Sequence, residues 1–292
     1  MTSIYSIYYF IGILIALVVS LRLLKLLVVR FFTSDYYKSL FAARMQMFSE
    51  LHKSGQTKSS KMRSELISVL NMKIAELGGD VVEIGAGPGN NTKFLQLPEG
   101  SFLIVVDYNP HMEKIFRKNM ETDNPNLHLK EFLVQSADDM SEIPDGSVSA
   151  VLATHLLCSL DDQQTRKVLK EIMRVLRPGG CYFFLEHVID KPGTMRRAVQ
   201  CMLGSVTGIW QLVADGCNPD KDTCQEIHQA GFGSVTLKNS LTEQFYLWND
   251  PIYTITSYVT RPKLWGHAVK HSIKRCTEKD KLAKLFESMA QA

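Results

Sequence analysis

The spacing of apolar and polar positions divides the chain into an apolar N-terminus, two helical segments and a long region where strands and helices alternate. Short β-branched runs recur at 81–84, 102–106, 127–134, 148–153 and 182–185, and two later runs lie at 234–241 and near 263–269. Helical spacing separates them at about 110–120, 161–176 and 224–230, the second stretch ending at Pro178-Gly179-Gly180. This alternation predicts a doubly wound α/β fold, with a mostly parallel seven-stranded sheet and helices on both faces.

The first thirty residues form a separate segment. No charged side chain occurs from Met1 to Leu21, which is about the length needed to cross a bilayer, and Arg22, Lys25 and Arg30 follow directly. A signal peptide would carry its basic residues before the apolar run and a cleavage site after it. A buried core helix is the other alternative. We predict an uncleaved membrane anchor over residues 1–30.

The basic flank of this segment predicts which side of the membrane the rest of the chain occupies. Short loops rich in Lys and Arg stay in the cytosol, so the residues after Arg30 are expected there. The basic half is also amphipathic, which leaves open whether the anchor spans the bilayer or lies in one leaflet.

Three further regions flank or interrupt the predicted sheet. Residues 31–77 form a helical lead-in, whose second helix has an apolar face of Leu66, Leu70, Ile74 and Leu77. Residues 191–223 lack a clean period, and we predict that they form a lid inserted within a domain that spans 78–270. Residues 245–258 are aromatic and receive no assignment. The charged tail, 271–292, is expected to be helical and receives no role.

Composition excludes several function classes. With 292 residues, 45% of them hydrophobic, the chain can bury one full-sized core. A net charge of +3 is too mild for a nucleic-acid partner. The six cysteines include no C-x-x-C pair, so neither a zinc site nor a disulfide framework is expected, and they are interpreted as reduced thiols.

The stretch from Val81 to Gly89 is the strongest candidate for a ligand site. A buried strand ends there in alternating glycines, Gly85, Gly87 and Gly89, which allow a sharp turn and close approach of a ligand to the backbone. Residues 90–92 can then open a helix whose free N–H groups face the turn. Asp107 ends the next strand about twenty residues later, where a nucleoside site places a carboxylate on the ribose, although a lone Asp is more often a helix cap.

In combination, these motifs resemble a class I S-adenosylmethionine-dependent methyltransferase over residues 78–190. The resemblance rests on Val82-Glu83-Ile84-Gly85-x-Gly87-x-Gly89, Asp107, Ala137-Asp138 and Leu176-Arg177-Pro178-Gly179-Gly180. It implies a Rossmann-like sheet and S-adenosylmethionine as cofactor. Glu83 and the glycines would then lie by the methionine moiety, Asp107 would hold the ribose hydroxyls and Asp138 the adenine amino group. Tyr108, Ala137 and Thr154 are assigned to the same site. A nicotinamide cofactor is excluded because Asn90 stands where the last glycine would be needed.

A narrower similarity, to the methyltransferase-like 7 family, covers nearly the whole chain to Lys270. It is carried by the apolar N-terminus together with Leu157-Cys158-Ser159, Glu186-His187-Val188, Asp215-Gly216-Cys217 and Gly266-x-Ala268-Val269-Lys270. Members are membrane-anchored thiol S-methyltransferases of the endoplasmic reticulum and lipid droplets, so the similarity implies a small alkyl thiol or hydrogen sulfide as acceptor. The chain departs from the family at His155, at the elongated stretch 242–261 and in the tail after Lys270.

A thiol acceptor must lose its proton before it attacks the methyl group, since the thiolate is the nucleophile. Residues just after the fourth and fifth strands face the donor in such a sheet, which nominates His155 and His187 as general bases, with Asp215 reaching in from the lid. Each has an ordinary alternative, because a histidine can cap a strand and Asp-Gly is a common turn pair. Cys158 and Cys217 are expected to form pocket wall.

Other readings of the same residues remain open. A lipid, quinone or arsenical acceptor would use an identical cofactor site, since the fold does not determine the acceptor. A non-catalytic membrane or lipid-droplet protein is a third possibility, opposed by the intact glycines, Glu83, Asp107 and Asp138. The sequence does not predict the oligomeric state.

Overall fold

One seven-stranded sheet forms the centre of the molecule, with the strand order β3-β2-β1-β4-β5-β7-β6. The computed structural model of the chain describes residues 2–51, 57–244 and 251–272. The strands are β1 (Val81–Ile84), β2 (Leu103–Val106), β3 (Leu129–Leu133), β4 (Val148–Thr154), β5 (Leu176–His187), β6 (Ser234–Leu241) and β7 (Pro262–Val269). Strands β1 to β5 pair in parallel, and β7 runs antiparallel to both of its neighbours. The predicted fold class is confirmed.

Side chains alternate across the sheet and fill two apolar layers. On one face, Val82 and Ile84 pack in the layer that contains α5 (Asp162–Val175) and α8 (Thr223–Gln229). On the other face, Val81 packs in the layer that contains α3 (Lys58–Leu77) and α4 (Met112–Asp123). Because successive strand residues point to opposite faces, burial of both faces requires continuous apolar runs, as the sequence has.

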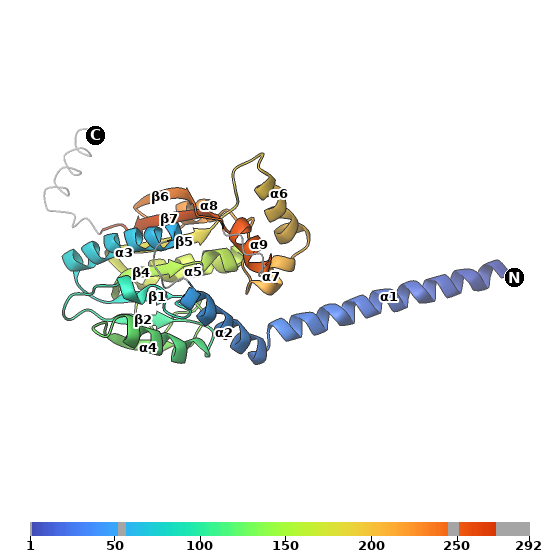
Figure 1. Cartoon of the computed structure of the whole chain (residues 1–292), viewed down its shortest axis with the longest axis horizontal. Coiled ribbons are helices and arrows are strands. Elements are labelled where there is room, and N and C mark those ends of the chain that lie inside the picture. The colour runs from blue at the N-terminus through green and yellow to red at the C-terminus, as the bar shows by residue number, and fades with distance from the viewer. Residues whose placement is uncertain (1, 52–56, 245–250, 273–292) are drawn as a thin grey trace, which may run out of the picture.

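Helix α1 (Thr2–Phe32) projects away from the sheet and its covering helices (Figure 1). Its segment Tyr8–Phe32 is long and apolar enough to cross a membrane, and none of it is buried within the protein. Helix α2 (Asp35–Leu51) follows after a short turn. Tyr37 of α2 contacts both α1 and the segment 191–223. Its ring lies 4.7 Å from that of Phe32, and its hydroxyl donates to the carbonyl of Leu212, at 3.2 Å.

Residues 191–223 form short helices beside the sheet, near the point where α1 meets α2 (Figure 1). They are α6 (Met195–Cys201), the π-helical turn η3 (Met202–Val206) and α7 (Ile209–Val213). Helix α9 (Pro251–Val259) lies against them and against the strand ends. This lid segment exposes apolar side chains, namely Met195, Met202, Val206, Ile209 and Val213.

Two local predictions were wrong. The helix expected to open at residues 90–92 is only a 3₁₀ turn, η1 (Thr92–Phe94), because the Asn91 side chain bonds to Glu83 instead of capping a helix. Pro178-Gly179-Gly180 lies inside β5, since Gly179 and Gly180 exchange backbone hydrogen bonds with Lys270. The unassigned residues 245–250 and the tail from 273 lie outside the described residues.

Candidate active site

The glycine turn after β1 needs its glycines for conformation and for space. Gly85, Gly87 and Gly89 have positive φ angles of 65°, 54° and 84°. A Cβ on Gly85 would lie 3.0 Å from Leu156, and one on Gly89 would lie 3.1 Å from Phe116. Other residues would therefore be strained at all three positions and crowded at two of them. The turn lies at the carboxyl end of β1, where open α/β sheets bind ligands, and its glycine N–H groups are held by the Val106 carbonyl, the Asp107 carboxylate and the Ala86 carbonyl.

Asp107, at the end of β2, is tied directly to this turn. One carboxylate oxygen accepts from the N–H of Gly87 and the other from the N–H of Asn109, each at 2.9 Å. Burial raises the pKa of Asp107, and the two N–H groups oppose that shift. The next residue, Tyr108, donates its hydroxyl to Asp215 at 2.6 Å. The predicted ribose carboxylate thus stands beside the glycine turn, with an aromatic ring next to it.

Glu83 and Asn91 form the deepest part of this site. Asn91 donates to the Glu83 carboxylate at 2.7 Å and to the hydroxyl of Thr154 at 3.1 Å. Burial raises the pKa of Glu83 to about 7. Within the described chain, the second Glu83 carboxylate oxygen and the Asn91 amide oxygen are buried acceptors without hydrogen-bond partners. Two unsatisfied acceptors fit a cationic ligand group such as an ammonium, which would supply the missing donors.

The remaining predicted cofactor residues follow β3, the neighbour of β2. Ala137 and Asp138 are half-buried there, and the Asp138 carboxylate accepts from the hydroxyl of Ser136. Because the sheet order is β3-β2-β1-β4, the predicted adenine, ribose and methionine contacts succeed one another along a single edge. The structure therefore brings together Asp138, Asp107, the glycines, Glu83 and Thr154 in the order that the resemblance implies.

A cavity of about 310 Å³ lies next to Thr154, between the lead-in helices and the strand ends. Five basic side chains line it, three of which, Arg63, Lys93 and Lys263, the sequence analysis missed. It is lined by Met45, Phe48, Ser49, Thr57, Ser59, Ser60, Arg63, Asn90, Lys93, Phe94, Asp123, His155, His187, Thr242, Glu243, Thr256, Ser257, Thr260 and Lys263. No described residue of the lid segment 191–223 is among them.

The two predicted histidines lie face to face in this cavity. Their ring centroids are 4.2 Å apart and their planes differ by 18°. Burial lowers the pKa of both histidines, and the nearby Lys263 lowers both further, so both rings are neutral near pH 7. His155 has a positive φ of 59°, an uncommon conformation outside glycine that is concentrated at functional sites. Lys263 stands opposite His187 in the sheet, and burial lowers its pKa to about 7.

Asp215, the third predicted base, lies on the donor side of the site. It has a positive φ of 50° and accepts from Tyr108, next to Asp107. Burial raises its pKa. Among the described residues that line the acceptor cavity, Asp215 does not appear. Its position therefore suits contact with the cofactor better than proton removal from an acceptor.

Cys158 and Cys217 lie behind His187. Each sulfur is 3.6 Å from the Nδ1 atom of that ring. Hydrogen bonding between the two thiols raises the pKa of Cys158 to about 12 and lowers that of Cys217. Both side chains are buried, and neither is among the described residues that line the cavity, so they lie behind it as a pair that the spacing of cysteines did not indicate.

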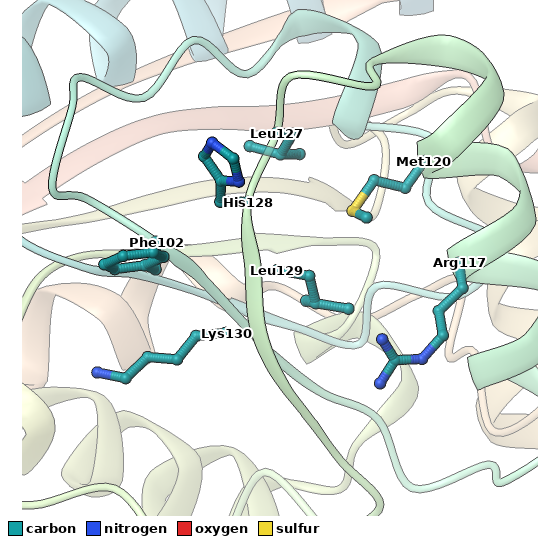
Figure 2. A pocket seen from close by; sticks show the side chains of 7 residues that line it. All are labelled: Phe102, Arg117, Met120, Leu127, His128, Leu129 and Lys130. Atoms are coloured by element: carbon teal, nitrogen blue, oxygen red, sulfur yellow. The ribbon is translucent and has the colours of Figure 1, made fainter.

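A second hollow lies at the opposite edge of the sheet and is excluded as the donor site. Figure 2 shows its lining, in which Arg117 and Met120 come from α4 and the others from the starts of β2 and β3. These are the amino ends of parallel strands, whereas ligands of open α/β sheets bind at the carboxyl ends. Lys130, in the lining, already pairs with Asp80 at 2.7 Å.

Comparison with known proteins assigns the family. Residues 82–184 match a family described as a methyltransferase domain. The chain is 33% identical over 190 residues to human thiol S-methyltransferase TMT1A, covering 65% of this chain and 70% of that protein. It is 31% identical over 238 residues to the rat thiol S-methyltransferase TMT1B, covering 82% of each.

The chain belongs to the thiol S-methyltransferase family. With the methyltransferase domain at 82–184 and relatives named thiol S-methyltransferases, the protein is an S-adenosylmethionine-dependent methyltransferase. The unsatisfied acceptors at Glu83 and Asn91 fit the cationic methionine end of that donor.

Solved structures support the fold. The CurJ carbon methyltransferase aligns with a TM-score of 0.53 at 16% identity, covering 79% of this chain and 59% of that one. A possible exported protein from Bordetella parapertussis aligns with a TM-score of 0.51 at 14% identity, covering 73% and 68%. At such identities these likenesses concern the fold alone.

Proposed function

We propose that this methyltransferase transfers its methyl group to the sulfur of a small thiol, an alkyl thiol or hydrogen sulfide, at a membrane surface. Relatives that match most of the chain are named thiol S-methyltransferases, which supports the choice of acceptor. The observation that carries the proposal is the basic wall of the cavity beside Thr154.

We call Arg63, His155, His187 and Lys263 the basic wall; Lys93 and the acidic Asp123 and Glu243 also line the cavity. The residues of the basic wall come from α3, the loop after β4, the end of β5 and the start of β7. No acidic side chain pairs with Lys263 in the part of the chain that the structure describes. A wall of this kind favours an acceptor that becomes negative when it reacts, because desolvated cations and N–H donors stabilise an anion in a low-dielectric site.

A thiol is such an acceptor, because it attacks as a thiolate. S-Adenosylmethionine supplies a methyl group already activated on a sulfonium. The protein must therefore hold the sulfur in line with that methyl group, exclude water and favour the ionised acceptor. Thr154 and His155 lie between the two halves of the site, so the cavity can present an acceptor directly to the donor.

The base roles of His155 and His187 stay predictions within this proposal. Both rings line the cavity, which is the geometric requirement for a proton acceptor. The predicted base role of Asp215 receives no such support, because Asp215 contacts Tyr108 on the donor side.

The membrane part of the proposal rests on α1 and the lid segment. Helix α1 offers an apolar surface with no protein cover, ending in Arg22, Lys25 and Arg30. The lid, tied to the anchor through Tyr37, exposes apolar side chains as well. We propose on this basis that the protein is held at a membrane with its catalytic domain in the cytosol. The endoplasmic reticulum and lipid droplets are the locations that the resemblance to the methyltransferase-like 7 family implies.

The acceptor is tested by methyl transfer from labelled S-adenosylmethionine to a panel that contains alkyl thiols, hydrosulfide, a quinol, arsenite and a phospholipid amine. We expect transfer to the thiols and its loss in Asp107→Ala. Donor binding without thiol methylation would contradict the acceptor and leave the methyltransferase assignment intact. Preference for the quinol would instead favour a quinol acceptor, the class of acceptor in the name of a relative from Schizosaccharomyces pombe, a polyprenyl-benzoquinol methylase 29% identical over 120 residues.

Membrane attachment is tested by flotation on liposomes of the full chain and of a variant that lacks residues 1–30. The variant should stay folded and leave the lipid fraction, because the two apolar layers of the sheet contain no residue of α1. A shortened protein that floated as the full chain does would contradict the anchor.

A further inference from the structure

Three segments that are far apart in the chain place sulfur and imidazole ligands around one point. Cys158 lies in the 3₁₀ turn η2 (Leu157–Ser159), His187 ends β5, and Cys217 follows the lid helix α7. The two sulfurs and the Nδ1 atom of His187 all lie within 4.8 Å of one another. These atoms are a potential metal-ligand set, and the catalytic proposal does not use them.

The two sulfur–nitrogen separations match those of a bound metal ion, and the two sulfurs lie within 4.8 Å of each other. Each sulfur is 3.6 Å from Nδ1. In a tetrahedral site with zinc–sulfur bonds of about 2.3 Å and zinc–nitrogen bonds of about 2.0 Å, sulfur and nitrogen are separated by about 3.5 Å. An ion can therefore enter between the three atoms with little movement of the side chains.

The backbone holds the two cysteine segments in this position. The N–H of Asn218, the residue after Cys217, donates to the carbonyl of Cys158 at 2.7 Å, so the two segments that carry the sulfurs are hydrogen-bonded to each other. The carboxylate of Glu186, fully buried, accepts from the N–H groups of Leu157 and Cys158 and fixes the turn that carries the first sulfur. Such supporting bonds around ligands are typical of metal sites.

Gly216 allows the lid segment to lie directly against the η2 turn. Its φ is 83°, and a Cβ there would lie 2.6 Å from the carbonyl oxygen of Ser159. Only glycine fits between the lid and the η2 turn, and this close contact brings Cys217 beside Cys158. Trp210 packs on both cysteines, and a hydrogen bond from its side chain helps to lower the pKa of Cys217, so its indole N–H stands where it can donate to a metal-bound thiolate.

We propose that Cys158, His187 and Cys217 bind one thiophilic metal ion, Zn²⁺ or Cu⁺, that fastens the lid to the end of β5. Two thiolates and an imidazole suit these d¹⁰ ions, whereas Mg²⁺ and Ca²⁺ require oxygen ligands. The three protein ligands leave a fourth position on Zn²⁺ for water or another small ligand, and Cu⁺ is satisfied by three. The alternative is a metal-free cluster of hydrogen-bonded thiols.

Metal binding would also determine the tautomer of His187. An ion on Nδ1 leaves the proton on Nε2, so the ring would act as a hydrogen-bond donor toward the acceptor cavity. The base role predicted for His187 and this metal site therefore exclude each other, and His155 would remain as the histidine available to accept a proton.

The experiment measures metal content of the full chain, purified in detergent with reductant, by mass spectrometry after loading with Zn²⁺ or Cu⁺. We expect one equivalent of metal in the wild type and in Cys224→Ser, a half-buried cysteine outside the cluster, and loss of the metal in Cys217→Ser and Cys158→Ser. Substitution with Co²⁺ should give thiolate charge-transfer bands that disappear in the same two variants.

A second measurement covers the case that the cysteine variants fail to fold. Treatment of the wild type with a chelator should lower its Tm and speed proteolysis of the lid, and Zn²⁺ should restore both. Metal that persists in folded Cys217→Ser would overturn the proposal. A folded, reduced wild type that takes up neither ion, or a chelator without effect on a loaded protein, would do so as well.

Discussion

The two halves of the active site are built in different ways. The donor half consists of backbone turns and carboxylates at consecutive strand ends, in which Asp107 holds the N–H of Gly87 and Asn91 holds Glu83. The acceptor half consists of basic side chains on four separate segments, with Arg63 and Lys263 at its extremes in sequence. One half is negative and locally built, and the other is basic and assembled by long-range packing.

This difference fits the charges of the two reactants. A sulfonium donor with an ammonium group is stabilised by carboxylates, and an acceptor that becomes an anion is stabilised by cations and N–H donors. The carboxylates of the donor half would repel an anionic acceptor, and the cations of the acceptor half would repel the cationic donor. The comparison therefore predicts that substitutions in one half leave binding to the other nearly unchanged.

The largest effect is expected for Asp107→Ala. The change removes the carboxylate that orders the glycine turn and would hold the ribose, and charged hydrogen bonds of this kind contribute about 1.5–3 kcal/mol each. Donor affinity should fall about 100-fold or more, measured by calorimetry. Asp139→Ala, an exposed carboxylate near the same strand edge, should bind normally. Equal loss in both variants would contradict the role of Asp107.

Lys263→Met should weaken binding of the thiol acceptor and leave binding of the donor unchanged. Loss of the buried amine removes one cation from the cavity wall, and we expect a rise in KM for the thiol of about tenfold, with donor affinity unchanged. Lys238→Met is the matched control, because Lys238 lies on the adjacent strand β6 and is exposed. If donor affinity fell together with thiol affinity, the two halves would not be separable.

Gly216→Ala tests the contact between the lid segment and η2, beside Asp215 on the donor side of the site. Its Cβ would approach the Ser159 carbonyl oxygen at 2.6 Å, whereas a Cβ on Gly193, with a φ of 81°, meets nothing within 4 Å. Both variants carry the cost of a positive φ, but only the first carries the clash. Urea denaturation should show Gly216→Ala to be about 2 kcal/mol less stable than Gly193→Ala. Equal stability would mean that the lid can move away from η2.

The last prediction concerns the pH dependence of donor binding. Burial raises the pKa of Glu83 to about 7, with Arg63 opposing the shift and Asp107 adding to it. Below that pH the side chain is neutral and cannot pair with the donor's ammonium. Donor affinity should therefore rise by up to about tenfold per pH unit toward pH 7 and then level off.

Glu83→Gln should bind more weakly and lose this slope. The same raised pKa means that the cofactor-free protein loses stability as the pH rises from about 4.5, the ordinary value, through 7, because the folded state holds the proton longer. The test is the affinity of the wild type for the donor between pH 5.5, about 1.5 units below the pKa of Glu83, and pH 7.5, just above it. A donor affinity that stayed constant over this range would contradict this account.

The donor half could be predicted from the sequence because its parts are local. Glycines in the turn, the strand before it and Asp107 at the next strand end occur in fixed order, and the backbone alone determines their geometry. Asn91 was assigned to a helix start, since a side chain that turns back to bond Glu83 leaves no sign in the spacing.

The acceptor half could be predicted only in part. His155 and His187 follow strands of the parallel sheet, so the topology placed them correctly at its carboxyl edge. Arg63 lies among polar residues of a helix and Lys263 at the start of the last strand, where charged residues are usually solvated. Their burial depends on long-range packing. For the same reason the C-x-x-C rule did not detect the pairing of Cys158 with Cys217.

The reversed direction of β7 has a consequence for how acceptor preference can change. Because β7 is antiparallel, its first residues reach the carboxyl edge of the sheet, and the connection from Leu241 to Pro262 borders the cavity with Thr242, Thr256 and Thr260. This connection is also the stretch, 242–261, that the family resemblance predicts to be elongated. Insertions here would reshape the acceptor site without touching β1 or β2. Gene duplicates could thus diverge in substrate while inheriting an unaltered donor site.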